Sequence, residues 1–433
     1  MRATRSTRTL GVLSLVLVGT LSASPAHAEP AARTVVVTGV GDAAAAVQRA
    51  GGTVLRRLPL VHGVVARVSG PVPGFTLTPD GPVALTGRSR GFGERGTRGA
   101  LAHDLLDVAD DDGAGVTVAV VDTGVADVPE LAGRVTHVDV TGDGTGDGYG
   151  HGTFVAGLVA GSEHGLAPAA QVLDVRVGHD DGSTSLVDVL TGLQAVSEHP
   201  EVSVVNLSLS TDEEVPPLTD ALDALWAMGD VVVVPAGNDG PGRNTVASPG
   251  TDPLLLTVGA LDGDRVADWS ARGGRGLDKP DLVAPGAHLV SAGLPGSVLW
   301  SEHPDAQRGD DGFVGSGTSF STALVSGAAA VLLARRPQLS PYRVKALLLR
   351  SADSVRGPRR ATGAGALDLD EALARRAPRG TDPAADTDGD PWDASSWSAS
   401  SWSARQWAAS SWSASSWSAR QWSARQWSAS SWG

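Results

Sequence analysis

Residues 116–124 read Val-Thr-Val-Ala-Val-Val-Asp-Thr-Gly, and this stretch decides the fold class. A run of Val and Ala without polar alternation is typical of a strand buried on both faces of a parallel sheet. Similar runs occur at residues 171–177, 202–209, 231–234 and 254–258, and helix-like stretches lie between or after them at 185–196, 217–228 and 319–334. This alternation predicts an α/β fold, a three-layer domain with a mainly parallel central sheet.

Composition divides the 433-residue chain into five segments. Residues 1–28 form a leader. Residues 29–98 contain a small α+β module, with the order strand, helix, strand, strand, and an Arg-rich connector. The main α/β domain then takes residues 99–376, an acidic linker takes 377–393, and a Trp/Ser-rich tail takes 394–433. Because the tail is low in complexity, we expect it to be disordered.

The leader is typical of a secretory signal peptide. Arg2, Arg5 and Arg8 precede an apolar stretch at 10–21, and Ala26-His27-Ala28 supplies a small-x-small cleavage site. The apolar stretch is well short of the ~20 residues that a spanning helix needs, so export is favoured over a membrane anchor. We expect an extracellular protein.

Charge and cysteine content restrict the partners. The formal net charge is -14 and no block of consecutive basic residues occurs, which argues against a nucleic-acid partner. The chain has no cysteine, so core packing, with or without bound ions, must stabilise it outside the cell.

Three short motifs supply an acid, a base and a nucleophile, in this order: Asp122-Thr123-Gly124, His151-Gly152-Thr153 and Gly317-Thr318-Ser319. An attacking serine needs an imidazole to take its proton, and the imidazole needs a carboxylate to fix its tautomer. Asp122 ends a buried strand, His151 follows a Gly-rich loop, and Ser319 opens a helix. Taken singly, Asp122 and Ser319 have a capping role as the more common alternative, so only the combination predicts catalysis.

Asn238, in Ala236-Gly237-Asn238-Asp239-Gly240, is a fourth candidate just past a buried strand. Its side-chain amide can donate to an oxyanion, with the Ser319 backbone N–H as the second donor. A turn asparagine is the alternative at this position.

These motifs, in the order Asp, His, Ser with Ala-Gly-Asn between the second and third, resemble those of the subtilisin-like serine proteases (peptidase family S8) over about residues 116–334. The resemblance implies Ser319 as nucleophile, His151 as general base and acid, Asp122 as orienting carboxylate and Asn238 as oxyanion donor. It also implies that the module at 33–83 is a pro-segment that assists folding and blocks the cleft until it is cut.

The resemblance further implies that an extended peptide substrate pairs as an added strand between two backbone segments. The substrate-binding residues would be Gly182, Ser183, Thr184, Ser208, Leu209, Ser210, Ala236 and Gly237. The chain departs from the family pattern at Phe320, usually Met, at Ala323, usually Pro, and at Ser210, usually Gly. The last difference leaves the substrate specificity open.

The loop at residues 141–148 carries Asp143 and Asp147 among glycines. Carboxylate oxygens suit Ca²⁺, which makes the two residues candidates for a structural calcium site. The alternative is a flexible acidic loop, because the about six to eight oxygens of a full ligand set are lacking. The chemistry itself requires no cofactor.

The tail has a tryptophan at every fifth residue from Trp392 to Trp432, with Arg405, Arg420 and Arg425 between them. Such a cationic-aromatic strip suits a cell-envelope polymer or a membrane surface, and a low-complexity tail without a partner is the alternative.

The sequence therefore predicts a secreted serine endopeptidase that is made as an autoinhibited precursor, with polypeptides as substrates and an acyl-serine intermediate. The alternative is a catalytically inactive protein of the same fold that binds the cell envelope or acts in adhesion through its Trp-rich tail. An α/β-hydrolase esterase is disfavoured, because the Gly-x-Ser-x-Gly motif and the order Ser, Asp, His are lacking.

Overall fold

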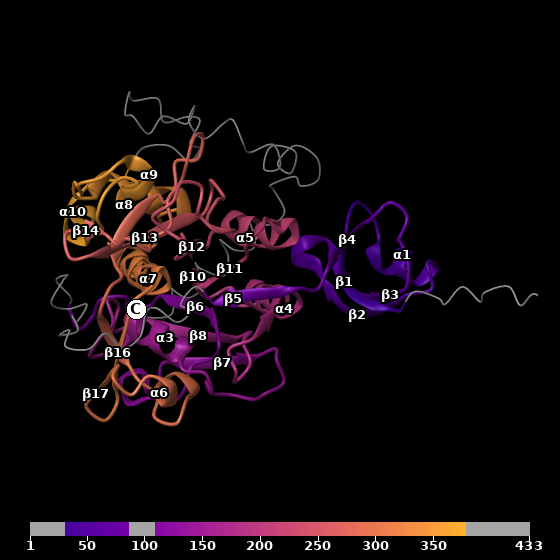
Figure 1. Cartoon of the computed structure of the whole chain (residues 1–433), viewed down its shortest axis with the longest axis horizontal. Helices are drawn as coiled ribbons and strands as arrows, with labels where there is room; N and C mark the ends of the chain where they lie inside the picture. Colours follow the sequence, from indigo (N-terminus) through magenta and orange to yellow (C-terminus); the bar gives the residue numbers. More distant parts are fainter. Residues whose placement is uncertain (1–30, 86–108, 378–433) are drawn as a thin grey trace, which may run out of the picture.

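The computed structural model describes residues 31–85 and 109–377, and Figure 1 shows a small N-terminal unit beside a larger body. The expected signal peptide, most of the connector, the acidic linker and the Trp-rich tail lie outside the described residues. The segment boundaries that depend on them stay predictions.

The N-terminal unit is a four-stranded antiparallel sheet with one helix. Its elements are β1 (Arg33–Thr38), α1 (Ala43–Arg49), β2 (Thr53–Leu58), β3 (Gly63–Val68) and β4 (Thr76–Pro79), and the strand order is β2-β3-β1-β4. Asp42 caps α1 by accepting from the Ala45 N–H at 3.0 Å. Strand β4 was not expected, because its four partly exposed residues give no clear apolar pattern.

The main sheet confirms the expected α/β class. Its order is β14-β13-β12-β10-β6-β8-β7, with β15 pairing β13, and every neighbouring pair is parallel except β13 with β14. The strands are β6 (Thr117–Asp122), β7 (Val135–Asp139), β8 (Gln171–Arg176), β10 (Val202–Leu207), β12 (Val231–Pro235), β13 (Leu256–Asp262), β14 (Arg265–Val266) and β15 (Leu282–Pro285).

Strand β6 is buried on both faces, as its composition predicts. Val118 and Val120 pack in one apolar core, and Ala119 and Val121 pack in the other. Helices α3 (His151–Ala160) and α7 (Thr318–Arg335) belong to the first core, and α4 (Leu186–Ser197) and α5 (Pro216–Met228) to the second. The domain therefore has the three layers expected.

Helix α7 passes through the first core. Its 18 residues are long and apolar enough to cross a membrane by length and composition, but 89% of that stretch is buried inside the protein. Its role is that of a core helix that carries Ser319 near its N-terminus.

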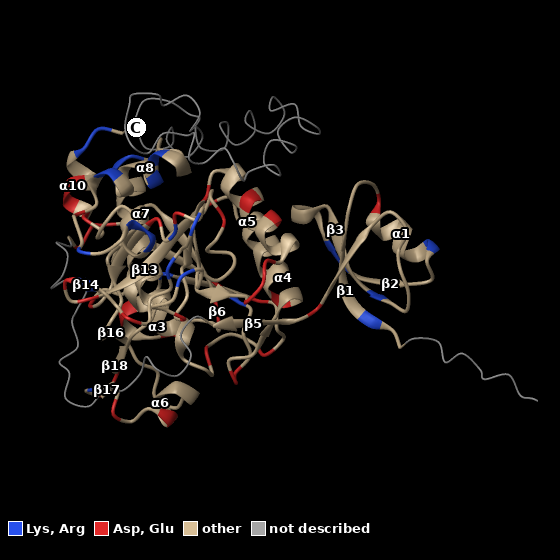
Figure 2. Ribbon diagram, turned by 45° about the horizontal axis from the view of Figure 1, so that its top comes forward, with Lys and Arg blue, Asp and Glu red and all other residues tan. Residues whose placement is uncertain are grey.

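The remaining elements surround this frame. Helix α8 (Pro341–Ser351) carries several Lys and Arg residues, coloured blue in Figure 2. A small sheet of order β16-β18-β17 lies beside α3. The strands of this sheet are β16 (Leu289–Ala292), β17 (Gln307–Arg308) and β18 (Gly312–Gly315). The other elements outside the main sheet are η2 (Pro129–Leu131), α6 (Val298–Glu302), α9 (Arg359–Thr362) and α10 (Leu369–Ala374).

The N-terminal unit meets the main domain at two places. The turn η1 (Pro59–Val61) contacts α4 and α5, and the Leu60 N–H donates to Gln194 Oε1 at 2.8 Å. Strand β5 (Pro82–Leu85) lies between β9 (Thr184–Ser185) and β11 (Leu209–Ser210) in a separate three-stranded sheet.

Candidate active site

Asp122 and His151 are brought together by the ends of two elements. Asp122 is the last residue of β6, and His151 is the first residue of α3. His151 Nδ1 lies 2.7 Å from Asp122 Oδ1, which also accepts from the Thr123 N–H at 2.8 Å. Both side chains are buried. The carboxylate is therefore placed to fix the tautomer that leaves Nε2 as the basic nitrogen.

A second buried carboxylate, Asp147, ties the two motifs together. One of its oxygens accepts from the Thr123 hydroxyl at 2.8 Å and from the Gly150 N–H at 2.7 Å. The other accepts from the backbone N–H and the hydroxyl of Thr153, both at 2.8 Å. Because a helix start leaves N–H groups without partners, this carboxylate both caps α3 and anchors it to the loop after Asp122.

The pKa of His151 is raised above its usual value. Burial works against the imidazolium, but the charge and hydrogen bond of Asp122 and the charge of Asp147 outweigh it. Negative charge beside a buried imidazole favours its protonated form. The pair is thus arranged to stabilise the cation that forms when the imidazole accepts a proton.

Ser319 lies in the first turn of α7, behind Gly317. Its hydroxyl lies 3.5 Å from the Ser208 carbonyl oxygen, to which it donates, and His151 Nε2 has no hydrogen-bond partner among the described residues. The hydrogen bond between the Ser319 hydroxyl and His151 Nε2 is therefore not formed here. In enzymes of this kind, such hydrogen bonds often form only when substrate binds. Phe320, next to Ser319, packs 5.6 Å from the His151 ring and 4.4 Å from the Phe154 ring, measured between centroids.

Asn238 is held by the residue that precedes Ser319. Its Oδ1 accepts from the Thr318 N–H and from the Thr318 hydroxyl, each at 3.0 Å. The Gly237 N–H in turn donates to the Thr318 hydroxyl oxygen at 3.2 Å. Because the carbonyl end of the amide is held by Thr318, only the Nδ2 end can act as a hydrogen-bond donor.

Two of the segments expected to bind substrate, residues 182–184 and 208–210, lie on either side of an extended strand. That strand is β5 of the same chain. Val83 pairs with Thr184 of β9, and Ala84 and Leu85 pair with Ser210 and Leu209 of β11. Val83 and Leu85 are buried, while Pro82 and Ala84 are exposed. The apolar run at 202–209, expected as one strand, forms two strands in the structure. Strand β10 ends at Leu207, and the short strand β11 begins at Leu209, with Ser208 between them.

The other expected substrate residues lie around this strand. Gly182 has a φ of +78° and packs on the Tyr149 ring, which a Cβ would meet at 2.6 Å. Ser183 follows it in the same turn before β9. Ala236 and Gly237 are buried beyond the end of β12 and precede Asn238.

The two calcium candidates are bonded to protein donors. Asp143 Oδ2 contacts His179 and Arg176, and both oxygens of Asp147 accept from N–H and O–H groups. Within the described ranges no group of three or more His, Cys, Asp or Glu side chains could hold a metal ion. As arranged here, the two carboxylates do not fit a calcium ion. No step of the proposed reaction depends on calcium.

Three contributors to the site were not identified from the sequence: Thr123, Thr318 and Arg176. Thr123 and Thr318 stand inside the motifs but look like spacers, and their contacts appear only when the loops meet. Arg176 carried a visible signal, because it is the one cation in the mainly apolar run at 171–177.

A family model described as the subtilase family (Peptidase_S8) matches residues 113–366, more than half of the chain. The chain belongs to the subtilase family. It is 36% identical over 273 residues to the serine protease AprX of Bacillus subtilis (strain 168), a match that covers 56% of this chain and 62% of AprX. It is 32% identical over 249 residues to subtilisin Savinase of Lederbergia lenta, covering 56% of this chain and 85% of that protein.

The subtilase fold also appears in the comparison with solved structures. The crystal structure of fervidolysin from Fervidobacterium pennivorans, a keratinolytic enzyme related to subtilisin, aligns with a TM-score of 0.65 and 24% identity. The alignment covers 82% of this chain and 63% of fervidolysin. It supports the fold of the chain and nothing beyond it.

Proposed function

We propose that this subtilase is a secreted serine endopeptidase that uses Asp122, His151 and Ser319. The observation that carries the proposal is the 2.7 Å contact between His151 Nδ1 and Asp122 Oδ1, with Ser319 at the start of the neighbouring core helix. The relative named serine protease AprX and the relative named subtilisin Savinase support the same reaction. Secretion rests on the leader sequence.

In the proposed reaction, Ser319 Oγ attacks the peptide carbonyl carbon while its proton passes to His151 Nε2. Asp122 holds the imidazole through Nδ1 and stabilises the imidazolium. The proton is then given to the leaving amine, and an acyl-serine remains. Water hydrolyses the acyl-serine by the same route, with His151 as base and then as acid.

Charge on the carbonyl oxygen would be stabilised by the Asn238 amide and the Ser319 backbone N–H. Thr318 fixes the carbonyl end of Asn238 through two hydrogen bonds to Oδ1, so the donor to the oxyanion would be the Nδ2 end. The N-terminus of α7 adds a favourable dipole for an anion at Ser319.

The proposed precursor is blocked by its own strand β5. A substrate that pairs with β9 and β11 needs the place that residues 82–85 occupy. Asp80 strengthens the contact, because its Oδ1 accepts from the Val187 N–H at 3.1 Å in the first turn of α4. Activity would then require a cut beyond Leu85 and release of the N-terminal unit.

Casein hydrolysis tests the proposal. The full chain and its Ser319→Ala variant would be expressed with secretion, and the culture proteins followed by mass spectrometry. We expect hydrolysis and an N-terminus beyond Leu85 with the natural chain. Ser319→Ala should hydrolyse no casein and should lose only the leader. Equal hydrolysis by both proteins would overturn the assignment of Ser319.

A further inference from the structure

Arg176 occupies an unusual place for a cation. It is the last residue of β8, paired in register with Asp122, and only 2% exposed. Burial of a charged group is costly unless it is paired and fully hydrogen-bonded. Its contacts therefore point to a role beyond filling the end of a strand.

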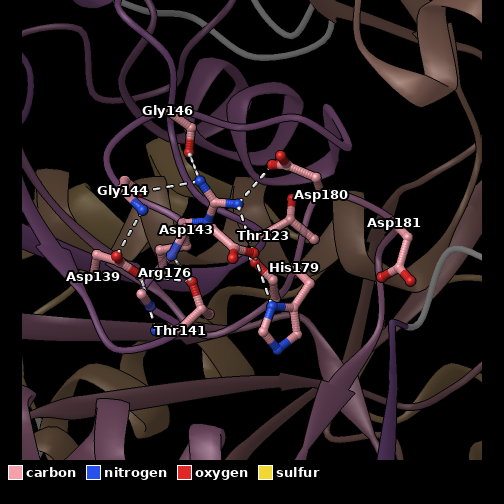
Figure 3. Close-up of polar contacts among 12 residues, drawn as sticks. Thr123, Asp139, Thr141, Asp143, Gly144, Gly146, Arg176, His179, Asp180 and Asp181 are labelled. Carbon is pink, nitrogen blue, oxygen red and sulfur yellow. Dashed lines mark hydrogen bonds and ion pairs between the residues drawn. The ribbon is translucent and has the colours of Figure 1, made fainter.

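Five oxygen atoms from two loops accept hydrogen bonds from the guanidinium. Figure 3 shows Asp143, Gly144, Gly146 and Asp180 around it. One loop, residues 141–148, precedes His151, and the other, residues 177–183, precedes β9. The contacts are Nη1 with Gly144 O at 3.0 Å and Gly146 O at 3.3 Å, Nη2 with Asp143 Oδ2 at 3.5 Å and Asp180 Oδ1 at 2.6 Å, and Nε with Gly178 O at 3.2 Å.

The first loop is fitted closely against the residues that carry the triad. A Cβ on Gly124 would lie 2.0 Å from the Gly146 carbonyl oxygen and 3.2 Å from Arg176 Cδ. Gly146 also immediately precedes Asp147, which caps the helix of His151. Arg176 thus holds the base of the loop on which the position of His151 depends.

The second loop is a closed turn that carries the substrate edge. The His179 N–H donates to Ser183 O, and the Gly182 N–H donates to His179 O, both at 2.8 Å. Asp180, inside this turn, receives the shortest contact of Arg176 at 2.6 Å. The His179 ring, 2.8 Å from Asp143 Oδ2, joins the turn to the first loop a second time.

We propose that Arg176 is a positioning residue that sets β9 at the distance from β11 needed to accept an extended peptide between them. The proposal rests on the proposed function and deepens it. Arg176 does not touch the peptide. It acts through the 177–183 turn, so its effect falls on substrates long enough to pair with β9.

The geometry favours arginine over lysine at this place. A guanidinium presents five N–H donors in a fixed plane, whereas an ammonium presents three from one point. Lysine would keep the charge but could not reach carbonyl groups of both loops together with Asp180. Arg176→Lys is therefore expected to be intermediate between the natural chain and Arg176→Met.

Arg134 offers a matched control within the same domain. Its guanidinium also binds backbone carbonyl groups, at 2.6 Å to Ala160 O and 3.1 Å to Ala170 O. These groups join α3 and the start of β8, away from the substrate edge. Arg134→Met removes a comparable set of hydrogen bonds without touching the β9 turn.

The experiment measures how strongly cleavage depends on substrate length. Secreted, processed enzyme would be assayed with peptide p-nitroanilides that carry two to five residues ahead of the anilide. The readout is the gain in kcat/KM from the shortest to the longest peptide. In Arg176→Met this gain in kcat/KM is expected to be about tenfold smaller, mainly because KM for the longer peptides rises. A tenfold change corresponds to the weakening of about two backbone hydrogen bonds between peptide and enzyme.

Asp180→Asn provides a second variant that is expected to fold, because the Asp180 side chain is 67% exposed. It should lose part of the length gain, whereas Arg134→Met should keep the full gain even if its melting temperature falls. A full length gain in both Arg176→Met and Asp180→Asn would overturn the proposal. If Arg176→Met is not secreted, a full gain in both Arg176→Lys and Asp180→Asn would overturn it.

The test separates this proposal from the proposed function. If the natural chain cleaves no peptide of any length, the endopeptidase assignment fails. If it cleaves all of them, and the variants differ from it only in overall rate and not in the length gain, only the role of Arg176 fails.

Discussion

Asn238 Oδ1 accepts two hydrogen bonds from Thr318, one from its N–H and one from its hydroxyl, at 3.0 Å each. Thr318 is also the residue before Ser319. The nucleophile and the proposed oxyanion donor are therefore held by one residue, and a movement of the first turn of α7 would move both.

Replacement of Asn238 by Leu is expected to lower kcat by about 10²–10³, the range measured when one oxyanion donor is removed from a protease of this family. KM should change little, because the donor acts on charge that develops in the transition state. Thr318→Val, which removes one of the two bonds to Oδ1, should cost less. A folded variant with unchanged kcat, or one that loses activity only through a raised KM, would contradict this reading, and circular dichroism checks the fold.

A charge placed on the buried side of β5 should free the cleft. Val83 is 4% exposed, so Val83→Asp would bury a carboxylate without a partner. In a Ser319→Ala background, which prevents cutting, we expect the backbone amides of residues 83–85 to lose protection from hydrogen exchange. Ala84→Asp is the matched control, since Ala84 faces outward and its backbone pairing should survive. Equal protection in both variants would argue against β5 as the blocking strand.

The acid side of the pH profile follows from His151. Its raised pKa means that the imidazole keeps its proton to a higher pH, and only the neutral form can act as base. We expect kcat/KM for an uncharged peptide to fall on the acid side with an apparent pKa above about 6.5. An apparent pKa clearly below the ordinary histidine value would contradict the effect of Asp122.

Both lysines of the chain, Lys279 and Lys345, share one buried carboxylate. Asp281 Oδ2 lies 2.7 Å from Lys279 Nζ and 3.1 Å from Lys345 Nζ. Burial holds the pKa of Lys345 well below its usual value. Asp281→Asn would remove the carboxylate that both buried lysines share, and we expect it to lower the free energy of unfolding by about 3–5 kcal/mol.

Urea unfolding of the Ser319→Ala protein measures this loss without self-digestion. Asp268→Asn is the control, because the Asp268 side chain is 99% exposed and lies 4.0 Å from Arg272 in a surface ion pair. It should leave the unfolding midpoint nearly unchanged. An Asp281→Asn midpoint equal to that of the control would show that the buried cluster contributes little.

The three-layer domain was predictable because its strands are buried on both faces. The runs at 116–121 and 231–234 contain almost only Val and Ala, and such runs leave few alternatives. Strands β7 and β9 were missed for the opposite reason. The first is half-buried and polar at several positions, and the second has two residues and exists only because it pairs with β5.

The candidate site was predictable as a set of motifs but not as a network. Order and placement singled out Asp122, His151 and Ser319, but not the bond between Thr318 and Asn238. Contacts between residues 80 positions apart follow from the fold, and no local pattern encodes them. For the same reason Arg176 was passed over, since its five oxygen partners come from two separate loops.

The central claim is that Ser319 is an activated nucleophile, and labelling by a fluorophosphonate tests it most directly. Processed, secreted protein would be treated with the probe, digested, and the labelled residue located by mass spectrometry. We predict a single label on Ser319, absent from the Ser319→Ala variant and much reduced in the natural chain after Asp122→Asn. Labelling of a different serine that persists in Ser319→Ala, or no labelling of the processed natural chain, would contradict the claim.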